Sequence, residues 1–246
     1  MPITRWSTKK TKHAIRYNRR AFPRIFFINH ESQMTLAINC RQCPRLATFL
    51  DEVKSSHPDY FALPVPSFGA PGSRLLIVGL APGMHGANRT GRPFTGDYAG
   101  KLLYGSLHKF GFATSAEPLD EANNANPELS LKNCRITNAV RCLPPQNKPE
   151  PAEIKQCNGY LARELSLLPQ GAAVMALGTI AHQAVLMALQ CRKSSFPFAH
   201  GAQHRLPEGA TLFDSYHCSR YNTQTKRLTT AMFEDVIANI SAHLEH

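Results

Sequence analysis

Four short apolar segments alternate with helix-forming stretches along the chain, and this alternation limits the folds open to it. The segments are rich in β-branched or small apolar residues and lie at 74–80, 135–140, 172–177 and 211–215. Apolar residues at helical spacing predict helices at 98–110, 152–168, 179–189 and 228–244. Strands that alternate with helices form βαβ units with right-handed crossovers. We therefore expect an α/β fold with an open parallel sheet of about four strands flanked by helices.

The loops after three of these strands carry unusual chemistry. In open parallel sheets the active site forms at the carboxyl ends of the strands, here at residues 81–97, 141–151 and 217–227. The first loop is rich in glycine, and glycines such as Gly83 let the backbone approach a ligand closely. It matches neither the P-loop nor the dinucleotide-binding pattern. Phe94 in this loop is either a platform for a planar base or an anchor in the core.

The charge balance favours a polyanionic partner, of which nucleic acid is the commonest. The chain holds 28 Lys and Arg residues against 17 Asp and Glu residues, a net charge of +11. Much of the excess lies in residues 1–33, a basic leader without the apolar core of a secretory signal. This leader is a disordered DNA-binding arm, a transit peptide, or upstream sequence translated ahead of Met34.

Residues 34–246 are expected to form a single domain. No apolar stretch reaches the ~18 residues of a membrane-spanning helix.

The seven cysteines, in a chain without an export signal, indicate a reducing compartment and a metal site. Cys40 and Cys43 form a C-x-x-C pair, and Cys142 and Cys157 flank a proline-rich loop that can bring its two ends together. Four thiolates suit Zn²⁺ or an iron–sulfur cluster. From spacing alone, incidental thiols remain an equal alternative. The other three are expected to be buried apolar residues: Cys134, Cys191 and Cys218.

Three segments in order along the chain resemble the uracil-DNA glycosylase superfamily in its iron–sulfur form. They are Gly79–Asp97, the run Thr137-Asn-Ala-Val-Arg-Cys-Leu-Pro-Pro-Gln-Asn-Lys-Pro149 and the loop His217-Cys-Ser-Arg-Tyr-Asn222. Leu80 stands where family-4 enzymes carry an acidic residue, so the first segment resembles family 5. Cys218 replaces the proline usual in the third segment and removes a backbone restraint beside His217.

The resemblance implies a three-layer sandwich and a [4Fe–4S] cluster, with zinc as the alternative occupant, on four ligands: Cys40, Cys43, Cys142 and Cys157. It implies that Phe94 stacks on the base and that Asn138 reads the base edge, because one amide can both donate and accept. Neutral His217 would donate to a base oxygen as the base departs.

The remaining site residues are assigned by chemistry. Asp97, the one carboxylate of the first loop, either handles the attacking water or caps the helix that follows it. Asn222 is expected to add a hydrogen bond near the sugar or the water. Ser219 and two basic residues of the same loop, Arg220 and Lys226, are candidates for phosphate contacts or are solvated loop residues.

Together these features predict a monofunctional glycosylase that removes uracil, and related deaminated bases, from DNA in base excision repair. It is expected to act as a cytoplasmic monomer with no membrane partner. A DNA lyase step would need an amine nucleophile, and no lysine of the three loops is placed to suggest one. The alternative is a non-catalytic iron–sulfur or zinc protein that binds nucleic acid or senses redox state. That alternative accounts for the charge and the cysteines but not for Asn138, Phe94 and His217 in three strand-end loops.

Overall fold

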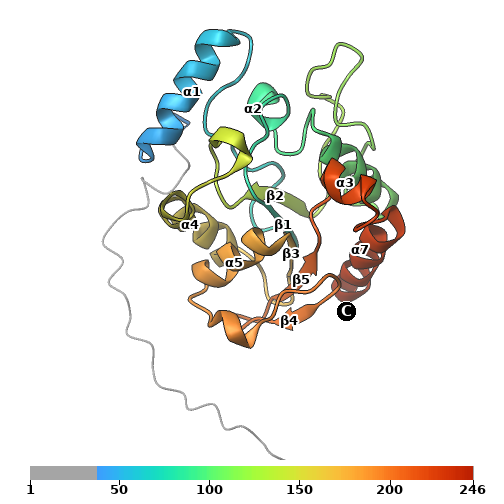
Figure 1. Ribbon diagram of the computed structural model, residues 1–246. Helices are drawn as coiled ribbons and strands as arrows, with labels where there is room; N and C mark the ends of the chain where they lie inside the picture. Colours follow the sequence, from blue (N-terminus) through green and yellow to red (C-terminus); the bar gives the residue numbers. More distant parts are fainter. Residues whose placement is uncertain (1–37, 246) are drawn as a thin grey trace, which may run out of the picture. The chain divides into compact units, whose positions relative to one another are not determined.

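The computed structural model describes residues 38–245, so the expectations for the leader lie outside the described residues (Figure 1). In this described part of the chain, five strands form one sheet in the order β2-β1-β3-β5-β4. Their bounds are Leu75–Gly79 for β1, Cys134–Asn138 for β2, Ala173–Leu177 for β3, Gln203–Arg205 for β4 and Thr211–Ser215 for β5. All pairings are parallel except β4 with β5. The predicted α/β fold is confirmed, and the antiparallel edge strand β4 is an addition to the four predicted strands.

Within residues 38–245, seven α-helices connect and flank the strands. Their bounds are Pro44–Ser56 for α1, Ala87–Thr90 for α2, Tyr98–Lys109 for α3, Pro151–Ser166 for α4, Thr179–Ala188 for α5, Arg220–Gln224 for α6 and Thr230–Glu245 for α7. Short 3₁₀ turns lie at Pro145–Asn147 and Lys193–Ser195. The four predicted helices correspond to α3, α4, α5 and α7, whereas the other three were not predicted. Within residues 38–245, no helix has the length and apolarity that a membrane crossing requires.

The alternating side chains of the buried strands build two cores, one on each face of the sheet. Leu75 and Ile77 of β1 pack into the core that contains Leu103 of α3 and Phe233 of α7. The intervening residues of β1 pack into the opposite core, with side chains of α4 and α5. Figure 1 shows α4 and α5 on one side of the sheet and α3 and α7 on the other. The chain therefore has the three layers predicted, and both faces of its central strands are buried.

Helix α1 forms a third, smaller core at the carboxyl edge of the sheet. Its apolar residues Leu46, Leu50 and Val53 pack with Val140 and Leu143 of the segment that follows β2. Cys142 belongs to the same core, and Cys43 and Cys157 pack against it. The packing of α1 therefore brings Cys43, at its N-terminus, close to Cys142 and Cys157.

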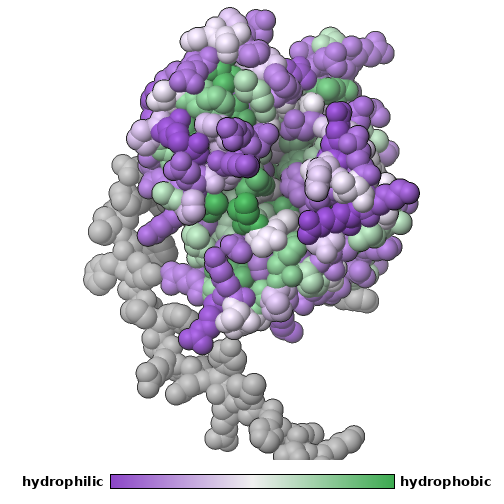
Figure 2. Space-filling view, viewed as in Figure 1, coloured by the Kyte–Doolittle hydropathy of each residue, from purple (hydrophilic) through white to green (hydrophobic). Residues whose placement is uncertain are grey.

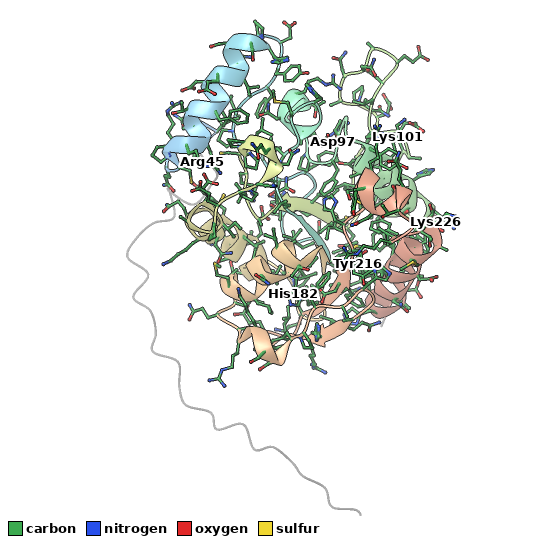
Figure 3. The ribbon with its side chains drawn as sticks, viewed as in Figure 1. Arg45, Asp97, Lys101, His182, Tyr216 and Lys226 are labelled. Carbon is green, nitrogen blue, oxygen red and sulfur yellow. The ribbon has the colours of Figure 1, made fainter. Side chains whose placement is uncertain are left out.

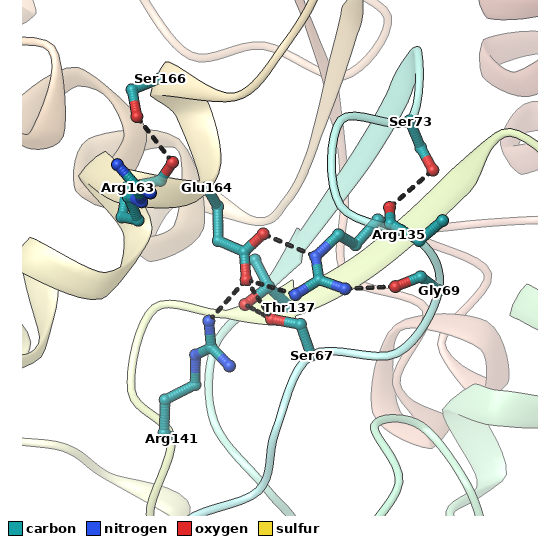
Figure 4. Close-up of polar contacts among 10 residues, drawn as sticks. Ser67, Gly69, Ser73, Arg135, Thr137, Arg141, Arg163, Glu164 and Ser166 are labelled. Carbon is teal, nitrogen blue, oxygen red and sulfur yellow. Dashed lines mark hydrogen bonds and ion pairs between the residues drawn. The ribbon is translucent and has the colours of Figure 1, made fainter. Parts of the chain in front are cut away.

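A buried ion network fastens β2 to α4 (Figure 4). Arg135 of β2 donates to both carboxylate oxygens of Glu164 on α4, at 2.6 and 2.9 Å. Arg141 donates to Glu164 at 3.2 Å, and the Ser67 hydroxyl donates to it at 2.6 Å. The Ser67 oxygen also lies 3.0 Å from the hydroxyl of Thr137, the residue before Asn138. Burial opposes ionisation of Glu164, but the hydrogen bonds from Arg135 and Ser67 outweigh it and lower the pKa.

The first prediction concerns this network. Glu164→Gln should lower the free energy of unfolding by about 3–5 kcal/mol, because two largely buried guanidinium groups lose their carboxylate. Glu234→Gln is the matched control: its partner Lys109 is exposed, so the loss should stay below about 1 kcal/mol. Denaturant titration at neutral pH measures both values.

The lowered pKa of Glu164 also predicts how this stabilisation changes with pH. The stabilisation from Glu164 is complete above the ordinary glutamate pKa of 4.5 and is lost as the pH falls through the lowered pKa of the folded state. The difference between Glu164→Gln and the unsubstituted chain should therefore shrink in acid. Equal losses for the two variants at neutral pH would contradict a special role for the buried network.

Candidate active site and cysteine centre

The pairing of β1 with β2 brings the first two predicted loops together. Gly79, the last residue of β1, lies opposite Asn138, the last residue of β2. A Cβ atom on Gly79 would stand 2.4 Å from Oδ1 of Asn138 and 2.7 Å from Cζ of Phe94. Neither distance is sterically allowed, so a glycine at position 79 is what permits the amide and the ring to approach each other.

Phe94 is an anchor in the core, one of the two alternatives that the sequence left open, and its role as a platform for a base stays a prediction. Its side chain is largely buried and belongs to the core under α3 and α7. Its ring lies 6.1 Å from the ring of His217, with the two planes at 30°. The backbone of Phe94 has φ 54°, in the left-handed region. Arg92 supports this conformation by donating to the carbonyls of Asn126 and Pro118, which belong to the segment before β2.

His217 reaches the same place from the loop after β5. Burial lowers the pKa of His217, so the imidazole is neutral at physiological pH. The side-chain amide of Asn222 donates to the His217 carbonyl at 2.8 Å. The Ser219 hydroxyl accepts from the Asn222 backbone N–H and thereby caps α6. Asn222 and Ser219 thus shape the His217 loop, and their contacts with substrate stay predictions.

Asp97 occupies the N-cap position directly before α3, but its side chain does not cap the helix. The structure gives its side chain no capping hydrogen bond, so the helix-cap alternative is wrong. The carboxylate instead packs against the backbone of the first loop: a Cβ on Gly86 would lie 2.0 Å from Oδ2, and one on Gly83 2.7 Å. Burial raises the pKa of Asp97, and the Ala87 backbone N–H partly offsets this rise. Gly83 therefore lies against the Asp97 carboxylate, and its contact with substrate stays a prediction.

Two residues near Asp97 were not found from the sequence. His85 directly precedes Gly86, whose backbone packs against the Asp97 carboxylate. The Tyr60 hydroxyl lies 2.8 Å from Nδ1 of His85 and fixes the orientation of that ring. His85 is inside the first motif and could have been noticed there. Tyr60 precedes β1, and no local pattern connects it with the loop.

The solvent-facing side of the third loop carries basic and aromatic residues. The Arg220 guanidinium lies 5.3 Å from the centre of the Tyr98 ring, a cation–π contact that joins α6 to α3. Tyr221 is 71 % exposed, and Lys226 is also exposed. Lys226 and Lys101 point outward on the same side of the view in Figure 3. In Figure 2, apolar residues occupy a hollow near the middle of this face, with hydrophilic residues around it.

The four predicted cysteine ligands line one cavity. Cys40 and Cys43 come from the segment that leads into α1, Cys142 from the loop after β2, and Cys157 from α4. The remaining wall is mostly apolar and includes Leu46, as expected for a shielded centre. The structure thus brings together two pairs that are about a hundred positions apart in the sequence.

The four thiols form a donor set that suits either candidate occupant. Within the described part of the chain, no three His, Cys, Asp or Glu side chains meet closely enough to hold a single metal ion. A [4Fe–4S] cluster needs its thiolates farther apart, because each binds a different iron. Burial raises the pKa of Cys43, and that of Cys142 to about 12. The donor set fits a [4Fe–4S] cluster and a single Zn²⁺ alike, and the choice between them stays a prediction.

Comparison with known proteins agrees with this geometry. A model of the uracil DNA glycosylase superfamily matches residues 66–241. The type-5 uracil-DNA glycosylase of Thermus thermophilus is 48% identical over 80% of this chain and 90% of its own length. The type-5 enzyme of Pyrobaculum aerophilum is 36% identical over 83% of this chain and 89% of its own length. A type-4 uracil-DNA glycosylase of Archaeoglobus fulgidus is 30% identical over 59% of this chain and 58% of its own length.

The match to the superfamily spans most of the described residues and includes all three strand-end loops. The more extensive similarity to type-5 than to type-4 proteins agrees with Leu80 after the first glycine. The chain belongs to the uracil DNA glycosylase superfamily, among its type-5 members.

Proposed function

We propose that the chain is a monofunctional DNA glycosylase that hydrolyses the N-glycosidic bond of uracil, and of other deaminated bases, in DNA. The observation that carries this proposal is the convergence of Asn138 at the end of β2 with Phe94 and His217 from two loops at one edge of the sheet. Membership of the superfamily and the names of the type-5 relatives support uracil as the base. The product is an abasic site, the first intermediate of base excision repair.

The chemistry requires a grip on the base and stabilisation of its departing charge. The sugar becomes oxocarbenium-like as the bond breaks, and the base leaves as an anion. Phe94 offers an apolar surface to the flipped base, and the Asn138 amide can donate to one polar edge group and accept from another. Neutral His217 donates to a base oxygen as negative charge develops there.

Water must then attack the sugar. Leu80 supplies no carboxylate at the position where family-4 enzymes have one, so we assign this task to Asp97. Its carboxylate is held against Gly83 and Gly86, and its raised pKa makes it a better proton acceptor than an ordinary aspartate. Asn222 is assigned a positioning role through the His217 carbonyl.

We further propose that Cys40, Cys43, Cys142 and Cys157 hold a [4Fe–4S] cluster. When bound, the cluster would serve as a structural crosslink, because glycosidic hydrolysis includes no redox step. It would tie α1 and α4 to the loop after β2. The seven cysteines are all free thiols, which is consistent with a reducing cytoplasm. We place the enzyme there as a monomer whose partner is DNA.

The second prediction is the activity itself. Purified protein should convert a uracil-containing oligonucleotide into an alkali-labile product, and an otherwise identical oligonucleotide with thymine should stay intact. Asn138→Ala should reduce the single-turnover rate by about 10²–10³, the typical cost of one hydrogen-bond donor at a developing charge. Asn239→Ala, an exposed position on α7, is the matched control and should leave the rate unchanged. No cleavage by the iron-loaded, folded protein would support the non-catalytic alternative.

The third prediction separates the departing base from the attacking water. The loss caused by His217→Ala should shrink for 5-fluorouracil, because that base already departs easily as an anion. The loss caused by Asp97→Asn should depend much less on the base. Single-turnover rates for both variants on both substrates give the comparison. A wild-type rate in folded Asp97→Asn would remove Asp97 from the mechanism and leave the glycosylase assignment intact.

The fourth prediction concerns the metal. Protein purified without air should be brown and contain about four iron atoms per chain. Cys157→Ala should lose the iron, whereas Cys191→Ala, outside the cavity, should retain it. Metal analysis and visible absorption measure both. Stoichiometric zinc without iron in the anaerobic preparation would reject the cluster.

A further inference from the structure

Arg141 connects the cysteine cavity with the ion network behind Asn138. It is 3 % exposed and directly precedes Cys142 in the loop after β2. Its Nη2 donates to Glu164 at 3.2 Å, whereas its Nε is buried and has no hydrogen-bond partner among the described residues. Arg141 also lines the cavity formed by the four cysteines. A buried N–H without a partner is costly, so this donor calls for an acceptor.

The network around Glu164 holds one more positive charge than negative charge, and we assign the surplus to Arg141. Arg135 already donates to both oxygens of Glu164 at shorter distances. Two guanidinium groups therefore face one carboxylate, and one buried positive charge has no counterpart in the network. On its other side, Arg141 lines the cavity together with Cys157 and the other three cysteines. An uncompensated buried cation is unfavourable, so the balancing anion should lie on the cysteine side.

The cavity would need such a cation when it is occupied. Four thiolates outweigh the positive charge of a [4Fe–4S] core and leave a net negative group in a mostly apolar wall. Of the residues among 38–245 that line the cavity, Arg141 alone carries a positive charge. Arg45 of α1, two residues after Cys43, instead donates to both carboxylate oxygens of Glu153.

We propose that Arg141 donates its free Nε–H to the group held by the four cysteines and balances its charge. This inference rests on the proposed cluster. It makes Arg141 a positioning residue that joins the cysteine centre to Glu164, Arg135 and Ser67, and through them to β2 and Asn138.

The test uses the iron-loaded full chain and a readout independent of base excision. Arg141→Gln and the matched Arg135→Gln each remove one cation from Glu164, but only the first removes one from the cavity wall. The rate at which an oxidant such as ferricyanide bleaches the visible absorption is measured for each. Arg141→Gln should bleach roughly tenfold faster than the unsubstituted protein, because a hydrogen bond to a charged group is typically worth about that factor. Arg135→Gln should bleach at the unsubstituted rate, and Arg141→Lys, which keeps the charge, should lie between.

Two results would overturn the inference: an unchanged rate in Arg141→Gln, or equal acceleration in both glutamine variants, which would trace the effect to Glu164. If circular dichroism shows Arg141→Gln to be unfolded, Arg141→Lys against Arg135→Lys gives the same comparison, with faster bleaching expected only for the first. Unsubstituted protein without iron would overturn the cluster and this inference together. Iron-loaded protein with unaffected Arg141 variants would overturn this inference alone.

Discussion

The in-register pairing of Gly79 with Asn138 is the contact on which the site depends. Parallel hydrogen bonding between β1 and β2 puts both residues at the edge where the strands end. Because Gly79 has no side chain, the Asn138 amide and the Phe94 ring both occupy the space above it. Any larger residue at position 79 would push one of them away. The geometry of the residues proposed to bind the base therefore follows from strand register and one missing Cβ.

Missing side chains at two glycines also make room for Asp97. Its carboxylate fits only because Gly83 and Gly86 offer bare backbone, and the Ala87 N–H partly compensates its burial. The glycines of the first loop thus have an internal role in addition to any contact with DNA. A carboxylate enclosed in this way is preorganised, as its proposed role in water activation requires.

Much of the fold, but less of the site, follows from the sequence. The apolar runs at β1, β3 and β5 predict buried strands because both faces of a parallel sheet are covered. β4 and α6 were missed because three to five residues are too few to show a period. The surroundings of Asp97 could not be predicted, since they depend on backbone clearance at glycines and not on residue type. Arg141 was visible beside Cys142, but its burial and its free donor appear only once α4 is packed on β2.

The substitution of Cys218 for proline illustrates how the third loop keeps its shape. Proline would fix the backbone beside His217, and cysteine does not. Here Cys218 is fully buried in the core under α3 and α7, so its side chain anchors the loop from below. Asn222 holds the His217 carbonyl from the other side, and Ser219 ties Asn222 to the start of α6. Side-chain packing and two hydrogen bonds thus replace a covalent restraint, and His217 stays within reach of Phe94.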